Sequence, residues 1–153
     1  SQVLDLDWDY QICSIQPAIS YDFLVGWTKE PAISSDLIRQ VKGAINEVFL
    51  KESQSAVKIL EKGLREGNKK EIETSIKRAD KNLKSLNPLI YTPALKELQE
   101  ATEGLSVCAK SSGAGGGDCG IALIFDPVET QTLIERWKEK NIEVIYQERM
   151  GDS

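Results

Sequence analysis

The chain has 153 residues, of which 41% are hydrophobic, and it carries a formal net charge of −5 with lysines and glutamates interspersed along the same segments. Its size and apolar content allow about 70% of the unfolded surface to be buried, which favours one compact domain. The acidic balance argues against nucleic acid as a partner, and the absence of histidine from the sequence excludes histidine-based triads and histidine metal sites.

The first third of the chain predicts two strands and then a helix. Residues 11–15 and the more apolar residues 22–27 have the composition of strands. From Ser34 onward the apolar residues recur at helical spacing, and Ser34 or Ser35 could cap the start of this helix. The residues on its apolar face are Leu37, Ile38, Val41, Ile45, Val48 and Phe49.

The middle of the chain predicts three more helices. The first runs near residues 53–66 and stops at Gly67, because a glycine readily takes the left-handed conformation that ends a helix. The second carries apolar residues at helical spacing over residues 72–86 and ends at an Asn-Pro pair. A threonine followed by a proline opens the third, which covers residues 92–103.

The last third returns mainly to strands. We expect strands at residues 105–110 and 119–125, then a helix that opens at an Asp-Pro pair, and a final strand at residues 142–146. This order predicts an α+β domain with a mostly antiparallel sheet of four or five strands and with helices packed on one side.

The stretch from Lys110 to Asp118 contains four glycines among the five positions 113–117. Glycines let the backbone approach a ligand closely, and successive N–H groups can then converge on an anion. The alternative is a flexible connection between two strands. The run matches neither the phosphate loop G-x-x-x-x-G-K-[ST] nor the dinucleotide motif G-x-G-x-x-G between a strand and a helix.

The cysteines and the hydropathy pattern indicate the compartment. Cys13, Cys108 and Cys119 are odd in number and form no C-x-x-C pair, which favours reduced thiols over disulfides or a zinc site. We expect Cys108 and Cys119 to pack as small apolar residues. A membrane-spanning helix needs about 20 consecutive apolar residues, and every apolar run in this sequence is far shorter. We therefore expect a cytoplasmic protein with no membrane partner, and Ser1 as first residue fits a processed or excised product.

Several of these stretches resemble a known enzyme family. Residues 112–123 (SGAGGGDCGIAL) resemble the third sequence motif of the GHMP kinases, which include galactokinase, homoserine kinase and mevalonate kinase. Three further stretches are similar to bacterial phosphomevalonate kinases in particular, namely residues 110–111 (KS), 25–35 (VGWTKEPAISS) and 145–149 (IYQER). The resemblance extends from residue 11 to the C-terminus.

This resemblance implies a kinase that transfers the γ-phosphate of ATP, with Mg²⁺, to mevalonate 5-phosphate in isoprenoid biosynthesis. It implies that residues 1–153 form the C-terminal domain, with a ferredoxin-like fold, and that ATP and Mg²⁺ are held mostly by an N-terminal lobe. No stretch of this chain matches the family's ATP loop, P-x-x-x-G-L-G-S-S-A. We therefore expect no catalytic or metal-binding residue in this chain, and no activity without its partner lobe.

The resemblance also implies that part of the substrate site lies on this chain. The substrate-binding residues it implies are Ser34, Ser35, Ser112, Gly113 and Ala114, with Ser34 preferred over Ser35. The rest of the glycine-rich loop comprises Gly115, Gly116, Gly117 and Asp118. Lys110 could balance phosphate charge beside this loop.

Each assignment has a plainer alternative. Ser34 and Ser35 could act only as helix caps. Lys110 could be a solvated lysine at a strand end, and Asp118 could hydrogen-bond only to the backbone of its own loop. Two other functions also remain open: another GHMP enzyme, such as mevalonate kinase or diphosphomevalonate decarboxylase, and a non-catalytic binding module of the same fold.

Overall fold

The computed structural model describes residues 17–29, 35–86, 92–112 and 119–151, and it confirms the α+β class. The strand predicted at residues 11–15 lies outside the described residues. In chain order the described elements are β1 (Tyr21–Trp27), α2 (Ser35–Ala44), α3 (Glu47–Glu66), α4 (Lys69–Leu86), α5 (Pro93–Glu100), β2 (Val107–Ser111), β3 (Cys119–Ile124), α6 (Pro127–Glu139) and β4 (Glu143–Met150).

The described strands form one antiparallel sheet in the order β2-β3-β1-β4. Trp27 at the end of β1 pairs with Cys119 at the start of β3 and with Glu143 at the start of β4. Ser111 at the end of β2 pairs with Gly120. The ends of β1 and β2 and the starts of β3 and β4 therefore meet at one end of the sheet. We call it the loop end, defined by Trp27, Ser111, Cys119 and Glu143.

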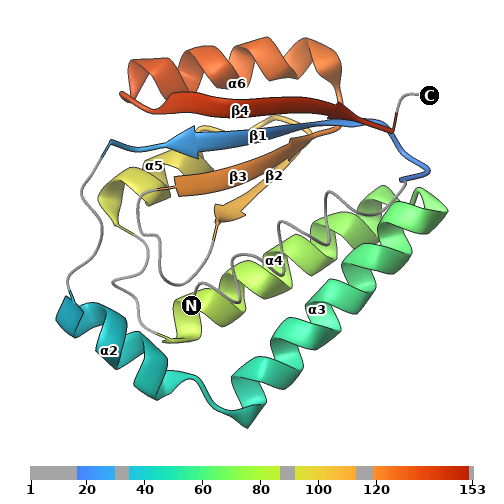
Figure 1. The fold of residues 1–153 in the computed structure, drawn as a ribbon. Coiled ribbons are helices and arrows are strands. Elements are labelled where there is room, and N and C mark those ends of the chain that lie inside the picture. Colours follow the sequence, from blue (N-terminus) through green and yellow to red (C-terminus); the bar gives the residue numbers. More distant parts are fainter. Residues whose placement is uncertain (1–16, 30–34, 87–91, 113–118, 152–153) are drawn as a thin grey trace.

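One face of the sheet is covered by α3 and α4, which lie side by side beneath it (Figure 1). Phe23 of β1 and Leu123 of β3 pack there against Leu60 and Ile76 from the two helices. All four side chains are at most 2% exposed. This α-helical hairpin buries its apolar stripe against the sheet, as the helical spacing of the sequence predicts.

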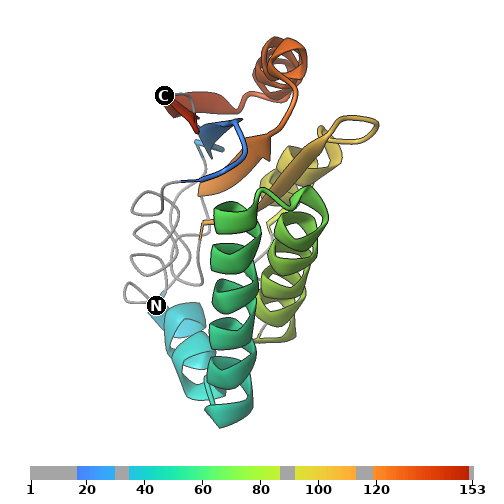
Figure 2. The same cartoon turned by 90° about the vertical axis from the view of Figure 1, so that its right-hand side faces the viewer.

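The other face is covered by α5 and α6, as the two views together show (Figures 1 and 2). Leu24 and Ala122 point to this face and pack against Leu98 of α5 and Trp137 of α6. The prediction that the helices lie on one side is therefore corrected to helices on both sides. The reason is visible in the sequence of β3, whose apolar residues do not alternate with polar ones, as is typical of a strand buried on both faces.

Helix boundaries follow local capping chemistry. Asn46 caps α3 by accepting a hydrogen bond from the Phe49 N–H at 2.9 Å, and Gly67 ends the helix in the left-handed conformation at φ 68°. The first helix therefore ends at Ala44 rather than continuing to Phe49, and the second begins at Glu47 rather than near residue 53. A cap at Asn46 interrupts a periodicity that runs through both helices. Within the described ranges, no helix combines the length and the apolar character that crossing a membrane requires.

Candidate functional site

The glycine-rich loop connects β2 to β3 at the loop end of the sheet, as predicted. The Ser112 N–H donates to the Cys119 carbonyl at 3.1 Å, so the antiparallel ladder holds together the two residues that bracket the loop. Ser112 is partly buried. The intervening residues, Gly113, Ala114, Gly115, Gly116, Gly117 and Asp118, lie outside the described residues, and their roles stay predictions.

Lys110 is fully buried, at 0% exposure. Its Nζ donates a hydrogen bond to the backbone carbonyl of Ser111. Its neighbour on β3 in the register is Ile121, which belongs to the core between the sheet and the α3–α4 hairpin. The alternative of a solvated lysine at a strand end is therefore wrong. A role for Lys110 in balancing phosphate charge stays a prediction.

The second predicted part of the site is the start of α2. Ser35 is the first residue of this helix, whereas Ser34 lies outside the described residues. In the first turn, Asp36 pairs with Arg39 at 2.7 Å between Oδ1 and Nη2. A helix start favours an anion, and an unpaired carboxylate there would oppose a phosphate group, so Arg39 offsets the charge that Asp36 brings. The substrate roles of Ser34 and Ser35 stay predictions.

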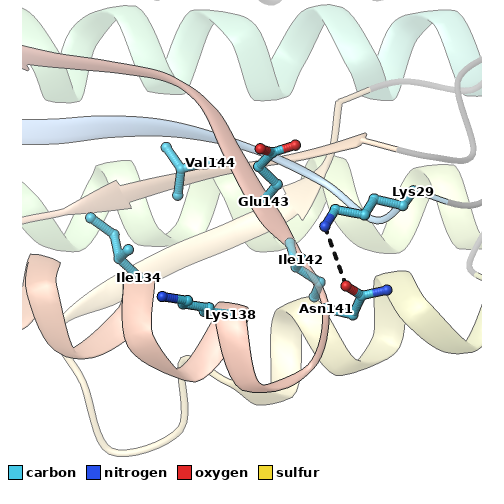
Figure 3. A pocket seen from close by; sticks show the side chains of 7 residues that line it. All are labelled: Lys29, Ile134, Lys138, Asn141, Ile142, Glu143 and Val144. Carbon is cyan, nitrogen blue, oxygen red and sulfur yellow. Dashed lines mark hydrogen bonds between the residues drawn. The ribbon is translucent and has the colours of Figure 1, made fainter.

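A cavity of about 500 Å³ also lies at the loop end, between the end of β1, α6 and the start of β4 (Figure 3). The Lys29 Nζ donates to the Asn141 Oδ1 across it, at 3.3 Å. Both residues have positive φ, 66° and 63°, which is uncommon outside glycine. The cavity is lined by Lys29, Ile134, Lys138, Asn141, Ile142, Glu143 and Val144.

Lys29 is a candidate cation that the residue pattern did not predict. It ends the stretch V-G-W-T-K, which carries part of the family resemblance but no charge-binding motif. Its signal was its place, two residues after a strand that ends near the glycine-rich loop. The lining of the cavity includes two lysines, Lys29 and Lys138, one glutamate, Glu143, and apolar side chains.

A smaller cavity, of about 320 Å³, lies where α4, α5 and β2 meet. Cys108 lines it and is 8% exposed, and burial raises the pKa of its thiol to about 12. Cys108 therefore stays protonated near neutral pH and packs as an apolar residue, as predicted. Cys119 at the loop end is only partly buried. Among the described residues, no cluster of three or more acidic or cysteine side chains has an arrangement that could hold a metal ion.

The comparisons with known proteins extend these observations. The family model described as GHMP kinases C terminal matches residues 60–143, which is more than half of the chain. The phosphomevalonate kinase of Streptomyces sp. (strain CL190) is 36% identical over 110 residues, which cover 65% of this chain and 29% of that relative.

Two solved structures of Streptococcus pneumoniae phosphomevalonate kinase share the fold. One has a TM-score of 0.84 at 48% identity and covers 89% of this chain and 42% of that one. The other, in complex with phosphomevalonate and AMPPNP, has a TM-score of 0.81 at 48% identity and covers 89% of this chain and 41% of that one. The chain therefore spans less than half the length of these relatives.

Proposed function

Because the chain belongs to the family GHMP kinases C terminal, we propose that it forms the acceptor-side half of a kinase acting on mevalonate 5-phosphate. In this reaction an oxygen of the acceptor's phosphate attacks the γ-phosphorus of ATP, a new P–O bond forms, and ADP leaves as the bond to the γ-phosphorus breaks. The product is mevalonate 5-diphosphate.

The observation that carries the proposal is the 48% identity over 89% of this chain with an enzyme whose structure contains phosphomevalonate and AMPPNP. The fold supports it, because the glycine-rich loop and the helix start that the sequence assigns to the substrate belong to the same domain. Two solved structures of mevalonate kinases are 16% and 22% identical to this chain, so their similarity supports the fold and not the acceptor.

In this proposal the chain binds the acceptor chiefly through hydrogen-bond donors. Ser35 begins α2 and Ser34 precedes it in the sequence, and free N–H groups and the dipole at a helix start favour a phosphate. Ser112, Gly113 and Ala114 supply the substrate-facing part of the loop, and Gly115, Gly116, Gly117 and Asp118 complete it. ATP and Mg²⁺ are assigned to the part of the enzyme outside this chain, and the substrates meet between the two parts.

The charge of the chain is consistent with this division. Phosphoryl transfer depends on positioning and on neutralising the charge that spreads over the transferring group. A domain with a net charge of −5 is a poor source of that neutralisation. Under the proposal, most of the cations therefore come from the other half, and this half contributes oriented backbone and hydroxyl groups. We accordingly propose that the isolated chain does not turn over ATP.

An assay of ADP release tests the reaction. The enzyme that contains both halves is supplied with ATP, Mg²⁺ and, in separate reactions, mevalonate, mevalonate 5-phosphate or mevalonate 5-diphosphate. We expect turnover with mevalonate 5-phosphate, and no ADP above background from the isolated chain. A preference for mevalonate, or release of CO₂ from the diphosphate, would assign the enzyme to another branch of the family. Turnover by the isolated chain would contradict the division into halves.

Substitutions of Ser34 separate substrate binding from helix capping. Aspartate is as good a cap as serine, but its charge opposes a phosphate. If Ser34 binds the acceptor phosphate, Ser34→Asp keeps the melting temperature and raises KM for mevalonate 5-phosphate by about 10- to 100-fold, the equivalent of one charge-assisted hydrogen bond. Ser85→Ala, at an exposed helical serine, is the control and should change neither quantity. An unchanged KM for mevalonate 5-phosphate in Ser34→Asp would mean that Ser34 only caps the helix.

A further inference from the structure

Lys110 occupies the penultimate position of β2, one residue before the strand ends and three before Gly113, the first glycine of the loop. It is among the largest fully buried side chains of the described part of the chain. Burying an ammonium group is unfavourable unless hydrogen bonds replace its water. A lysine held at this position therefore calls for an explanation in terms of what its ammonium group contacts.

The ammonium group contacts the peptide unit that joins β2 to the loop. Lys110 Nζ donates to the Ser111 carbonyl, and the N–H of the next residue, Ser112, donates to the Cys119 carbonyl. The Ser111 carbonyl and the Ser112 N–H belong to one peptide unit. In a trans peptide these two groups point in opposite directions, and the described residues contain no cis peptide. One peptide plane is therefore held from both sides.

The strand ladder explains why this carbonyl needs a side-chain partner. In an antiparallel pair, alternate residues direct both backbone groups to the partner strand. Because the Ser112 N–H bonds to β3, the carbonyl of Ser111 points away from β3. Among the described strands, β2 lies at the edge of the sheet, so this carbonyl is directed away from its strand partner. On that side the Lys110 ammonium donates a hydrogen bond to it.

The sequence beyond this peptide makes the fixation important. Glycines impose little restriction on backbone direction, so the direction in which the chain leaves β2 is set by the last residues of the strand. A cation that bonds to a carbonyl also polarises its peptide and strengthens the hydrogen bond made by the N–H on the other side. The two hydrogen bonds of the Ser111–Ser112 peptide therefore reinforce each other.

We infer that Lys110 is a positioning residue, which clamps the Ser111–Ser112 peptide and thereby sets the direction in which the glycine-rich loop leaves the sheet. Lys110 acts through the backbone and not by contact with a phosphate group. The consequence for acceptor binding rests on the proposed function, whereas the clamp itself does not.

The clamp is tested by nuclear magnetic resonance on the isotope-labelled chain. Lys110→Met keeps an unbranched side chain of similar length and removes the donor, and Lys96→Met, at an exposed lysine of α5, makes the same change of charge and composition elsewhere. In Lys110→Met we expect the amide hydrogen of Ser112 to exchange about 10- to 100-fold faster, with a changed Ser111 carbonyl shift. Lys96→Met should leave both unchanged.

A measurement on the unsubstituted chain covers the case in which Lys110→Met does not fold. The Lys110 ammonium protons should exchange slowly enough with water to give a resolved signal that correlates with the Ser111 carbonyl. Absence of this signal overturns the clamp, and so does an unchanged Ser112 exchange rate in a folded Lys110→Met.

Kinetics of the enzyme with both halves then separate the clamp from the proposed function. We expect Lys110→Met to raise KM for mevalonate 5-phosphate while KM for ATP is unchanged. A raised KM with unchanged Ser112 exchange would mean that Lys110 acts on the substrate directly, which overturns the inference. Faster Ser112 exchange in Lys110→Met, together with no turnover of mevalonate 5-phosphate by the unsubstituted enzyme, would support the clamp and refute the proposed function.

Discussion

Replacing Gly120 by alanine tests how closely α5 packs on the sheet next to the loop end. A Cβ at Gly120 would lie 2.8 Å from both Cδ atoms of Leu98, and 3.2 Å from the carbonyl oxygen of Lys110. Carbon atoms prefer separations of about 3.5–4.0 Å, so Leu98 would have to move by close to an ångström. Leu98 is fully buried and both of its methyl groups lie close to the new atom, so any movement that relieves the contact must displace other core side chains.

The magnitude follows from two opposing terms. Overpacking of this kind destabilises a core by about 1–3 kcal/mol. Replacing glycine by alanine also restricts the unfolded chain, which offsets about 0.4–1 kcal/mol. We therefore expect Gly120→Ala to lower the free energy of unfolding by about 1–2 kcal/mol. Urea denaturation can be followed by tryptophan fluorescence, to which the buried Trp137 contributes; its Nε1 donates to the Leu98 carbonyl at 3.1 Å.

A double-mutant cycle identifies the contact responsible. Leu98→Ala alone should destabilise by about 2–5 kcal/mol, because it leaves a cavity. In that background the methyl group of Gly120→Ala enters the vacated space, so its own effect should fall to zero or become stabilising. Gly43→Ala in α2 is the control, since a Cβ there meets no atom within 4 Å and should stabilise by up to about 1 kcal/mol. Additive effects of the two core substitutions would refute the packing argument.

Three further outcomes are expected. Arg149→Met should lower the free energy of unfolding by about 2–4 kcal/mol, because it removes the Arg149 Nη1 that lies 3.1 Å from the buried Asp22 carboxylate. Asp22→Asn should cost less, and the reverse order in urea denaturation would contradict this reasoning. Cys108 should resist alkylation in the native chain at pH 8. The pKa of Cys108 is raised from 9.0 to about 12, so between these pH values the native state keeps a proton that the unfolded state releases. The free energy of unfolding should therefore fall as the pH rises from 9.0 to about 12, and this fall should be smaller in Cys108→Ala. Asn46→Ala should destabilise α3 by about 0.5–2 kcal/mol in thermal unfolding, whereas Asn46→Ser should be nearly neutral.

Much of the fold could be predicted because its signals are local. A threonine or aspartate followed by proline marks the starts of α5 and α6, and each side chain accepts the hydrogen bond expected of a cap. Gly67 marks the end of α3 in the same way. Such signals act within a few residues, so no knowledge of the tertiary structure is needed to interpret them.

The wrong predictions concern signals that depend on what packs where. An apolar face runs at helical spacing from residue 34 to residue 49, and only the cap at Asn46 divides it between two helices. Asparagine is also common inside loops, so the sequence does not identify it as a cap in advance. The two-sided cover of the sheet follows from the pairing of β1 with β3, which places Leu24 and Ala122 together on the face opposite Phe23.

In the candidate site, too, features set by local sequence could be predicted and features set by tertiary packing could not. The position of the glycine-rich loop between two strands could be predicted, because the run of glycines and the apolar segments on either side of it are visible in the sequence. The burial of Lys110 could not, since a lysine near the end of a strand is ordinarily solvated. Its burial depends on the α3–α4 hairpin, which covers the face to which Lys110 points, and this hairpin is formed by residues far away in the sequence.

The burial of Lys110 also bears on where the positive charge of the site comes from. An ammonium group that is fully buried and bonded to a strand carbonyl cannot turn to a ligand without giving up that hydrogen bond, which is costly in a buried environment. Lys29 and Arg39 are exposed, and their partners are a side-chain amide and a carboxylate at the surface. If this half contributes any cation to a phosphate, exposed residues of this kind are better suited than Lys110.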